Sequence, residues 1–320
     1  MDKTIQNINK TKEIVGRRYS ISDDLYGTMF LVCYGLITKF GEFYTPIIDK
    51  LIRTTDVYVG DKPITTLLDE GGYGAEDIYC GEDLDNKYFS TSAASFPGDD
   101  IWFEDGKIRY YRNNPTLFCS TTDKEYTEVL NSILHEFAHL VKGSINYLNI
   151  DNSDYFSIRS GLNIFGGELD KNGDFREFSE NLIFDEVINV FQTTDMMMEI
   201  GKLIPTLLPL VVQKDFSRLN LDDMNALYGY EYGVEPMLSL WHNEHFKSLV
   251  EDNIVVGNLC KIRDEFNYVV GRNYFNTLSR YLNLLEYAED EKEQQRLTSF
   301  VRTIVRIYNL KTKGLEKRKH

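Results

Sequence analysis

Cysteine is scarce in this 320-residue sequence, and none of the four cysteines belongs to a Cys-x-x-Cys pair. Disulfide frameworks and cysteine-based zinc knuckles need clustered or regularly spaced cysteines. The four residues are Cys33, Cys80, Cys119 and Cys260. Their scatter excludes both kinds of scaffold and is typical of a reduced, intracellular chain.

Long hydrophobic runs are also missing. The most apolar stretch, Leu25–Thr38, has fourteen residues without a charge, whereas a membrane-spanning helix needs about 20. We therefore expect this stretch to form a buried helix or core strand. The first twenty residues are polar and contain no apolar core, so we expect no signal peptide. These features predict a cytoplasmic protein with no membrane partner.

Basic residues are outnumbered, with 35 Lys and Arg against 50 Asp and Glu and a net charge of −15. Nucleic-acid binding needs a basic face, so nucleic acid is excluded as the main partner. The one basic run, residues 311–320, is expected to be a solvated terminus. A phosphate-binding loop is missing too, because the glycine-rich stretch 69–77 has no lysine and is typical of a turn.

The apolar fraction of 42% and the aromatic fraction of 13% indicate a folded globular chain. Residues 1–55 have helical periodicity. Residues 56–120 are rich in turns and short β-type runs, and the pair Asp105–Gly106 predicts a hairpin turn.

A helix is predicted from about Thr122, where Thr122 and Glu125 have the spacing of a capping box, to Gly143 as a C-cap. Residues 144–175 are expected to be irregular. A second helix is predicted at about 176–195, and the pattern from 200 to 310 is helical again.

The stretch Ser132–Gly143, SILHEFAHLVKG, places His135 and His139 four residues apart with Glu136 beside the first histidine. On a helix, positions i and i+4 lie on one face about 6 Å apart, so both imidazoles can reach one metal ion. Zinc lowers the pKa of its bound water toward 7, and Glu136 can accept the proton. The alternative is a chance match on an amphipathic helix, but the uncharged flanks favour a helix half-buried beside a metal.

The segment ILHEFAHLV resembles the active-site helix of zincin metallopeptidases. The resemblance implies one Zn²⁺ per chain and hydrolysis of a peptide bond in a peptide or protein substrate. It implies that His135 and His139 are zinc ligands and that Glu136 is the catalytic glutamate. Metzincins continue the motif with a glycine and a third histidine, but here Lys142 and Ile145 stand at those positions, which excludes that class.

A catalytic zinc needs a third protein ligand. The other histidines are His242, His245 and His320. Because the first two look like surface or core residues of a helix, a carboxylate is the better candidate. The segment Leu182–Thr193, LIFDEVINVFQT, is similar to the glutamate helix of gluzincins, and this similarity makes Glu186 the third ligand. Glu177 and Glu180 are the alternatives, unless they form an ordinary solvated helix face.

Gluzincins often carry an acidic residue four positions after the ligand glutamate, where it orients a zinc-bound histidine. Here that position is Val190. The similarity to gluzincins therefore requires Asp185, Asn189 or a backbone carbonyl to take this role.

Zincins commonly use a tyrosine or histidine to stabilise the oxyanion. The segment 227–241 supplies Tyr228, Tyr230 and Tyr232, of which we nominate Tyr230, with His242 and His245 as alternatives. Because the chain contains 21 tyrosines, an ordinary core or surface role is the more common one for any single residue of this set. Upstream, the segment Gly106–Cys119 predicts either an edge strand that pairs with an extended peptide or a plain buried strand.

Together these patterns predict an α+β chain with a zincin-like two-lobed fold. Residues 1–55 form a helical region, 56–200 a catalytic core, and 201–320 a mainly helical subdomain. The core would combine a small mixed or antiparallel sheet with the active-site and glutamate helices. Substrate would lie in a cleft between the sheet-bearing and helical halves.

The expected function is that of a zinc-dependent metallopeptidase of gluzincin character and bacterial type. Two alternatives remain. The chain could be a catalytically inactive zincin-fold binding or regulatory protein, with Val190 marking a lost function, although the intact His135, Glu136 and His139 argue against this. It could also be a metalloprotease of the toxin or effector type.

Overall fold

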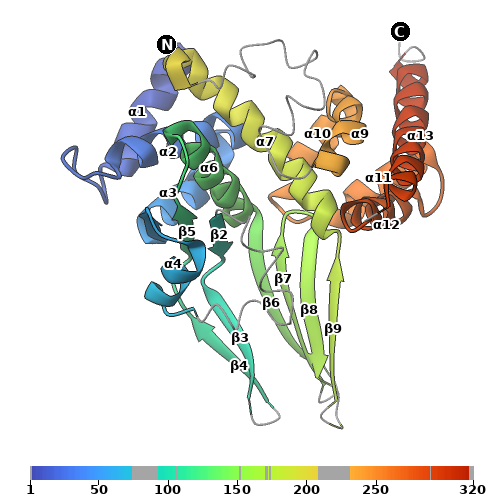
Figure 1. The fold of residues 1–320 in the computed structure, drawn as a ribbon, viewed down its shortest axis with the longest axis horizontal. Helices are drawn as coiled ribbons and strands as arrows, with labels where there is room; N and C mark the ends of the chain where they lie inside the picture. The colour runs from blue at the N-terminus through green and yellow to red at the C-terminus, as the bar shows by residue number, and fades with distance from the viewer. Residues whose placement is uncertain are drawn as a thin grey trace. The chain divides into compact units, whose positions relative to one another are not determined.

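The computed structural model describes residues 2–73, 93–104, 107–150, 153–169, 172, 174–207, 231–288 and 290–316. These residues form a mixed α+β chain with small sheets and many helices (Figure 1), as the sequence predicts. The chain divides into two compact units. The first comprises residues 1–141 and 192–213, and the second comprises residues 142–191 and 214–320.

The first unit combines helices with two small sheets. Its helices are α1 (Lys3–Val15), α2 (Tyr26–Phe40), α3 (Thr45–Thr54), α4 (Ile64–Glu70), most of α6 (Tyr126–Lys142) and the second half of α7 (Leu182–Leu203). Its strands are β1 (Asp56–Gly60), β2 (Ala93–Phe96), β3 (Asp99–Glu104), β4 (Lys107–Arg112) and β5 (Thr116–Ser120).

The apolar stretch predicted to be a buried helix or core strand is helix α2, and most of its residues are buried. Gly35 lies at its closest contacts with other helices. A Cβ at Gly35 would lie 3.1 Å from Leu134 of α6 and 3.3 Å from Met196 and Ile200 of α7. The small residue therefore lets α2 pack tightly against both helices, which fixes α6 in the core of this unit.

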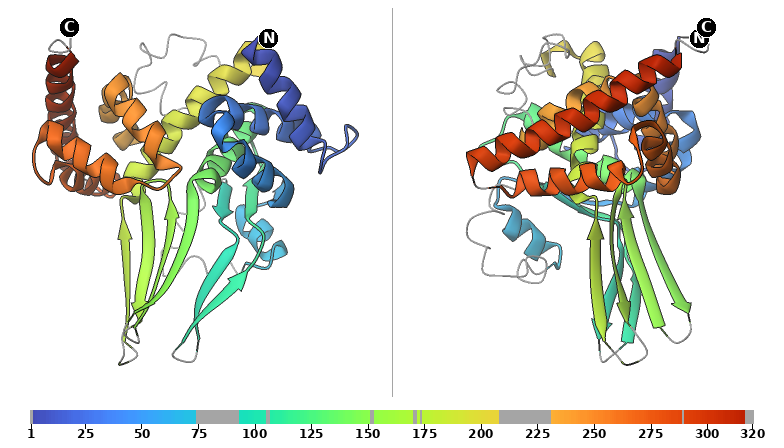
Figure 2. Two further views of the ribbon diagram at one scale, coloured as in Figure 1. Left: turned by 180° about the vertical axis from the view of Figure 1, so that it is seen from behind. Right: turned by 90° about the vertical axis from the view of Figure 1, so that its right-hand side faces the viewer.

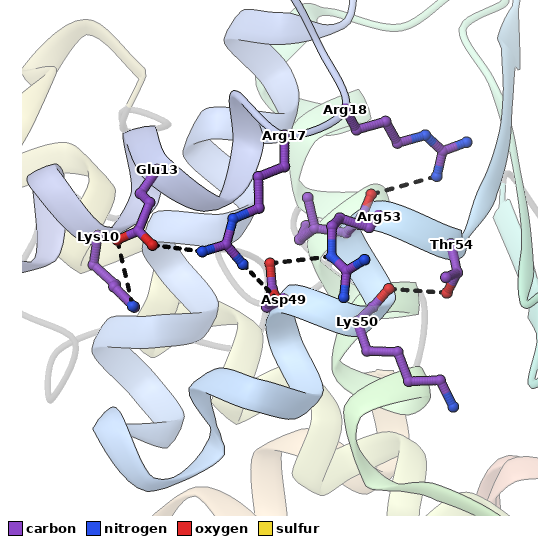
Figure 3. Close-up of polar contacts among 9 residues, drawn as sticks. Lys10, Glu13, Arg17, Arg18, Asp49, Lys50, Arg53 and Thr54 are labelled. Carbon is purple, nitrogen blue, oxygen red and sulfur yellow. Dashed lines mark hydrogen bonds and ion pairs between the residues drawn. The ribbon is translucent and has the colours of Figure 1, made fainter.

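A row of exposed ion pairs joins α1 to α3 (Figure 3). Glu13 contacts Lys10 at 3.5 Å and Arg17 at 2.5 Å, and Arg17 reaches Asp49 at 2.9 Å. Asp49 also contacts Arg53 at 3.3 Å. Surface pairs of this kind contribute little each, so the buried apolar faces of the helices supply most of the stability here.

The three-stranded sheet has the order β1-β5-β2, with β5 parallel to β1 and antiparallel to β2. Strand β5 is buried along its whole length, and its Phe118 stacks on Tyr58 with ring centroids 5.0 Å apart. Of the two interpretations of Gly106–Cys119, the buried strand is therefore correct for β5. The edge-strand interpretation is wrong for β5 because β1 and β2 occupy its two sides, and β2 is at the edge among the described strands.

The predicted hairpin is confirmed in its pairing. Strands β3 and β4 are antiparallel, and Glu104 lies opposite Lys107. Only two residues can then connect the strands, as the Asp-Gly pair predicts. The pair itself lies outside the described residues.

Helix α6 begins later than predicted. Its N-terminal hydrogen bonds start from the carbonyl of Glu125, whose own N–H donates to Glu128 Oε2 at 2.9 Å. The capping box predicted at Thr122 and Glu125 is therefore wrong, because the turn before the helix passes through Asp123 at φ +57°. The predicted end of the helix is confirmed, since α6 ends at Lys142 and Gly143 directly follows it as the first residue of a strand.

The second unit contains a four-stranded antiparallel sheet with the order β6-β7-β8-β9 (Figures 1 and 2). The strands are β6 (Gly143–Ile150), β7 (Ser153–Ser160), β8 (Asn163–Leu169) and β9 (Phe175–Glu180). This sheet contradicts the expectation of irregular structure at 144–175. The predicted helix at 176–195 is wrong at its start, because 175–180 is β9 and α7 begins at Leu182 after Asn181 at φ +62°.

The described residues of the second unit that follow residue 230 are mainly helical, in agreement with the periodicity from 200 to 310. The helices are α9 (Glu231–Trp241), α10 (Glu244–Ile254), α11 (Leu259–Val270), α12 (Tyr274–Glu286) and α13 (Glu291–Glu316). Arg159 of β7 donates to the carbonyls of Ile254 at 2.7 Å and Val255 at 3.2 Å at the end of α10, so it joins the sheet to these helices. None of the described helices has both the length and the apolar character needed to cross a bilayer.

Candidate metal centre

The two histidines of the HEFAH motif lie one turn apart on α6, and their rings converge. The two Nε2 atoms are 3.1 Å apart, and both side chains are half-buried. In a tetrahedral zinc site with bonds of 2.0–2.1 Å, two nitrogen ligands are about 3.3 Å apart. The apolar side of the helix, with Leu134 and Phe137 fully buried, anchors this arrangement in the core.

Glu186, the third ligand that the sequence predicts, lies in the first turns of α7 beside the two histidines. One ligand atom from each of His135, His139 and Glu186 lies within 4.8 Å of the other two. Ile183 and Val187 are buried on either side of Glu186 along the helix, whereas Glu186 itself is half-buried. Two imidazoles and one carboxylate form a donor set that zinc takes in catalytic sites, so the residues fit the metal.

Glu136 is held from outside its own helix. The hydroxyl of Ser95 on β2 lies 2.7 Å from Glu136 Oε2 and 3.3 Å from the Glu136 carbonyl oxygen. A hydroxyl has one proton to donate. Of the two oxygens, the carboxylate Oε2 is both the closer and the stronger acceptor, so the hydrogen bond goes to Oε2. Ser95 therefore orients Glu136. The sequence gives no signal for it, because a lone serine in a β-type run is common.

A buried polar cluster joins the last residue of α6 to the first half of α7. Lys142 Nζ donates to Asn189 Oδ1 at 2.8 Å and lies 3.7 Å from Asp185 Oδ1, and all three side chains are fully buried. Burial lowers the pKa of Lys142, while the nearby carboxylates of Asp185 and Glu186 act in the opposite direction. Lys142 thus contacts the two residues that the sequence proposes as substitutes for an acid at Val190. Val190 itself is a buried core residue.

The alternative carboxylates are on a strand, not on a helix. Glu177 and Glu180 belong to β9, and Glu180 is exposed. Among the residues whose side chains are described, the metal-binding group does not include Glu180. The expectation that they belong to the helix of Glu186 is therefore wrong.

The candidates for stabilising the oxyanion are only partly described. Tyr228 and Tyr230 lie outside the described residues, and of Tyr232 only the backbone, in α9, is described. His242 is exposed in the turn between α9 and α10. His245 belongs to the helical part, where its Nδ1 lies 2.8 Å from the hydroxyl of the fully buried Tyr308. His320 also lies outside the described residues.

Comparison with protein-family models, with curated proteins and with solved structures gives no match. The chemistry of the site therefore has to follow from its own residues. These are three convergent ligands, a glutamate beside the first of them, and a serine that holds this glutamate. Such a set can bind a divalent metal ion and move a proton next to it.

Proposed function

We propose that the chain is a zinc-dependent metallopeptidase with a zincin-like, two-lobed fold of gluzincin character. His135, His139 and Glu186 would hold one Zn²⁺, and the convergence of their ligand atoms within 4.8 Å is the observation that supports this most strongly. Three protein ligands leave a fourth position open, as in catalytic zinc sites. When bound, zinc would act as a Lewis acid and make a water molecule more acidic.

Glu136 is the general base in this proposal. Its carboxylate takes a proton from the attacking water and then delivers it to the nitrogen of the leaving amine. Ser95 donates to Oε2 and so leaves Oε1 for the proton transfer. Tyr230 remains our candidate for stabilising the oxyanion.

The substrate would be a peptide or protein bound in extended form. Strand β2 is at the edge of its sheet among the described strands, and it carries Ser95, the residue that contacts Glu136. A peptide paired with this edge would have its carbonyls near Glu136. For Gly106–Cys119 the sequence allows either an edge strand or a buried strand, and in this sheet the proposal places the substrate-binding edge at Ala93–Phe96 instead of at β5.

Replacement of Glu136 by glutamine tests this function. The amide has nearly the same shape but cannot accept the proton, so cleavage of a peptide library, followed by mass spectrometry, should fall at least about 10³-fold. Zinc content should stay at one per chain. The matched control is Glu180→Gln, which changes an exposed glutamate on β9 and should leave cleavage unchanged.

The same experiment separates an enzyme from a binding protein. If wild-type protein contains zinc but cleaves no member of the library, the zincin-fold binding or regulatory alternative is favoured. If Glu136→Gln cleaves as fast as wild type, Glu136 is not the base and the proposed mechanism is wrong.

A further inference from the structure

Lys142 is the last residue of the helix that carries both histidines, and its side chain is fully buried, which is unusual for a lysine. Its side chain has no exposed surface, and its contacts are Asn189 Oδ1 at 2.8 Å and Asp185 Oδ1 at 3.7 Å. Ion pairs in the interior are weak stabilisers, because the cost of removing two charges from water offsets their attraction. Their best-attested use is to fix the register of packed helices.

The spacing along the two helices relates the contact between Lys142 and Asn189 to the proposed zinc ligands. Lys142 follows His139 by three residues, and Asn189 follows Glu186 by three residues. Residues three apart share one face of a helix. The hydrogen bond from Lys142 to Asn189 therefore joins the last residue of the helix that carries His139 to the face of α7 that carries Glu186.

Asp185 is fixed from a second direction. Its Oδ1 accepts the backbone N–H of Leu162 at 2.7 Å, in the turn between β7 and β8. Gly161 in this turn has φ +60°, and a Cβ there would overlap Asp185 Oδ1. Arg159 of β7 also attracts the Asp185 carboxylate. The carboxylate that receives Lys142 is thus held by the sheet as well as by its own helix.

We infer that Lys142 is a positioning residue for the metal site. Its contacts with Asp185 and Asn189 tie the last residue of α6 to the first half of α7, which carries Glu186, and so help to bring together the three ligands His135, His139 and Glu186. This inference rests on the proposed function, because it assigns Lys142 a role in zinc binding. In the sequence motif, Lys142 matters only because it stands where metzincins have a glycine; the inference gives Lys142 a role of its own.

The test uses the double variant Lys142→Met/Asp185→Asn. Methionine keeps an unbranched side chain, and asparagine keeps an acceptor for the Leu162 N–H, so both charges of the Lys142–Asp185 pair are removed together. The zinc dissociation constant is measured by competition with a chromophoric chelator, and the visible spectrum of the Co²⁺-substituted protein reports the ligand geometry. We expect zinc binding to weaken about tenfold or more, as when outer residues of metal sites are changed, and the Co²⁺ spectrum to change.

Two matched comparisons separate positioning from general stability. Lys39→Met removes another largely buried lysine, which contacts Asp195 of the same α7 at 2.5 Å, and should leave zinc binding unchanged. Glu186→Ala should weaken zinc binding strongly in wild type but have little further effect in the double variant. A merely structural lysine would leave the effect of Glu186→Ala intact.

Each outcome has a defined meaning. Unchanged zinc affinity and Co²⁺ spectrum in the double variant would overturn the inference and leave the proposed function standing. A wild-type protein that binds no zinc would overturn the proposed function and the inference with it. If the double variant does not fold, Asn189→Ala, which keeps the Lys142–Asp185 pair, is measured in its place. Normal zinc affinity in Asn189→Ala, or its failure to fold, also overturns the inference.

Discussion

At the scale of single residues, the hydroxyl of Ser95 donates a hydrogen bond to the carboxylate of Glu136, the proposed general base. We predict that Ser95→Ala lowers kcat of peptide cleavage about tenfold, since a hydrogen bond to a charged group is worth about 1.5–3 kcal/mol and water replaces part of it. Ser95→Thr keeps the hydroxyl and should restore most of the activity. Equal zinc content in all three proteins is the control, and an unchanged kcat in Ser95→Ala would show that Ser95 does not orient the base.

Two buried thiols predict a pH dependence of stability. Burial raises the pKa of Cys33 and of Cys119 from 9.0 to about 12. Above pH 9 the unfolded chain loses thiol protons that the folded chain keeps. The free energy of unfolding therefore falls by about 1.4 kcal/mol per pH unit for each thiol as the pH rises from 9 toward 12. Below pH 9 this contribution is fully present.

Urea unfolding of wild type, Cys33→Ala and Cys119→Ala between pH 8 and 10.5 measures this slope. Each substitution should make the fall above pH 9 less steep by the contribution of one thiol. Cys260→Ala is the control, because Cys260 is exposed, and its curve should run parallel to that of wild type. Parallel curves for all three variants would contradict the prediction.

Single residues differ in how far the sequence reveals them. His135, Glu136 and His139 can be predicted because one helical turn brings them together whatever the rest of the chain does. Glu186 needs a resemblance to a known helix, since 46 residues separate it from His139. Ser95 and the role of Lys142 cannot be predicted, because their contacts with Glu136 and with Asn189 depend on tertiary packing.

At the scale of elements, the turn between β7 and β8 is the point where the sheet meets α7. We predict that Gly161→Ala lowers the free energy of unfolding by about 3 kcal/mol, combining left-handed strain of about 1 kcal/mol with a steric overlap against Asp185. Gly72→Ala should cost only about 1 kcal/mol, because Gly72 also has a positive φ but faces open space. Urea unfolding measures both values, and equal costs would show that the contact at Asp185 is not tight.

The elements near the site also show which patterns can be read from a sequence. The apolar stripe of α6 makes that helix visible, whereas α2 is apolar nearly all round, so its sequence fits a buried helix or a core strand. The strands β6–β9 are not recognisable one by one in the sequence, because their residues include many Asn, Ser, Asp and Gly and no single strand has a strong alternation. Turn residues about ten positions apart, near 151, 161 and 172, are the signal that predicts such a sheet.

At the scale of the whole molecule, the compact units are not continuous in sequence. The chain passes from the first unit to the second after Val141, returns at Gln192 within α7, and leaves again after Gln213. Patterns read along a sequence predict boundaries between consecutive segments, such as those we expect near 55 and 200. Units that alternate along the chain are set by tertiary contacts and have no local signature.

The measurement that most directly tests the zinc site is the metal content of purified protein, determined by mass spectrometry for wild type, Glu186→Ala and Glu180→Ala. The wild type should contain one zinc per chain. Glu180→Ala should retain it, because Glu180 is an exposed residue of β9, and Glu186→Ala should contain much less than one. One zinc per chain in Glu186→Ala would contradict the assignment of Glu186 as the third ligand. A wild-type protein without zinc, even after dialysis against the metal, would contradict the proposed metallopeptidase function.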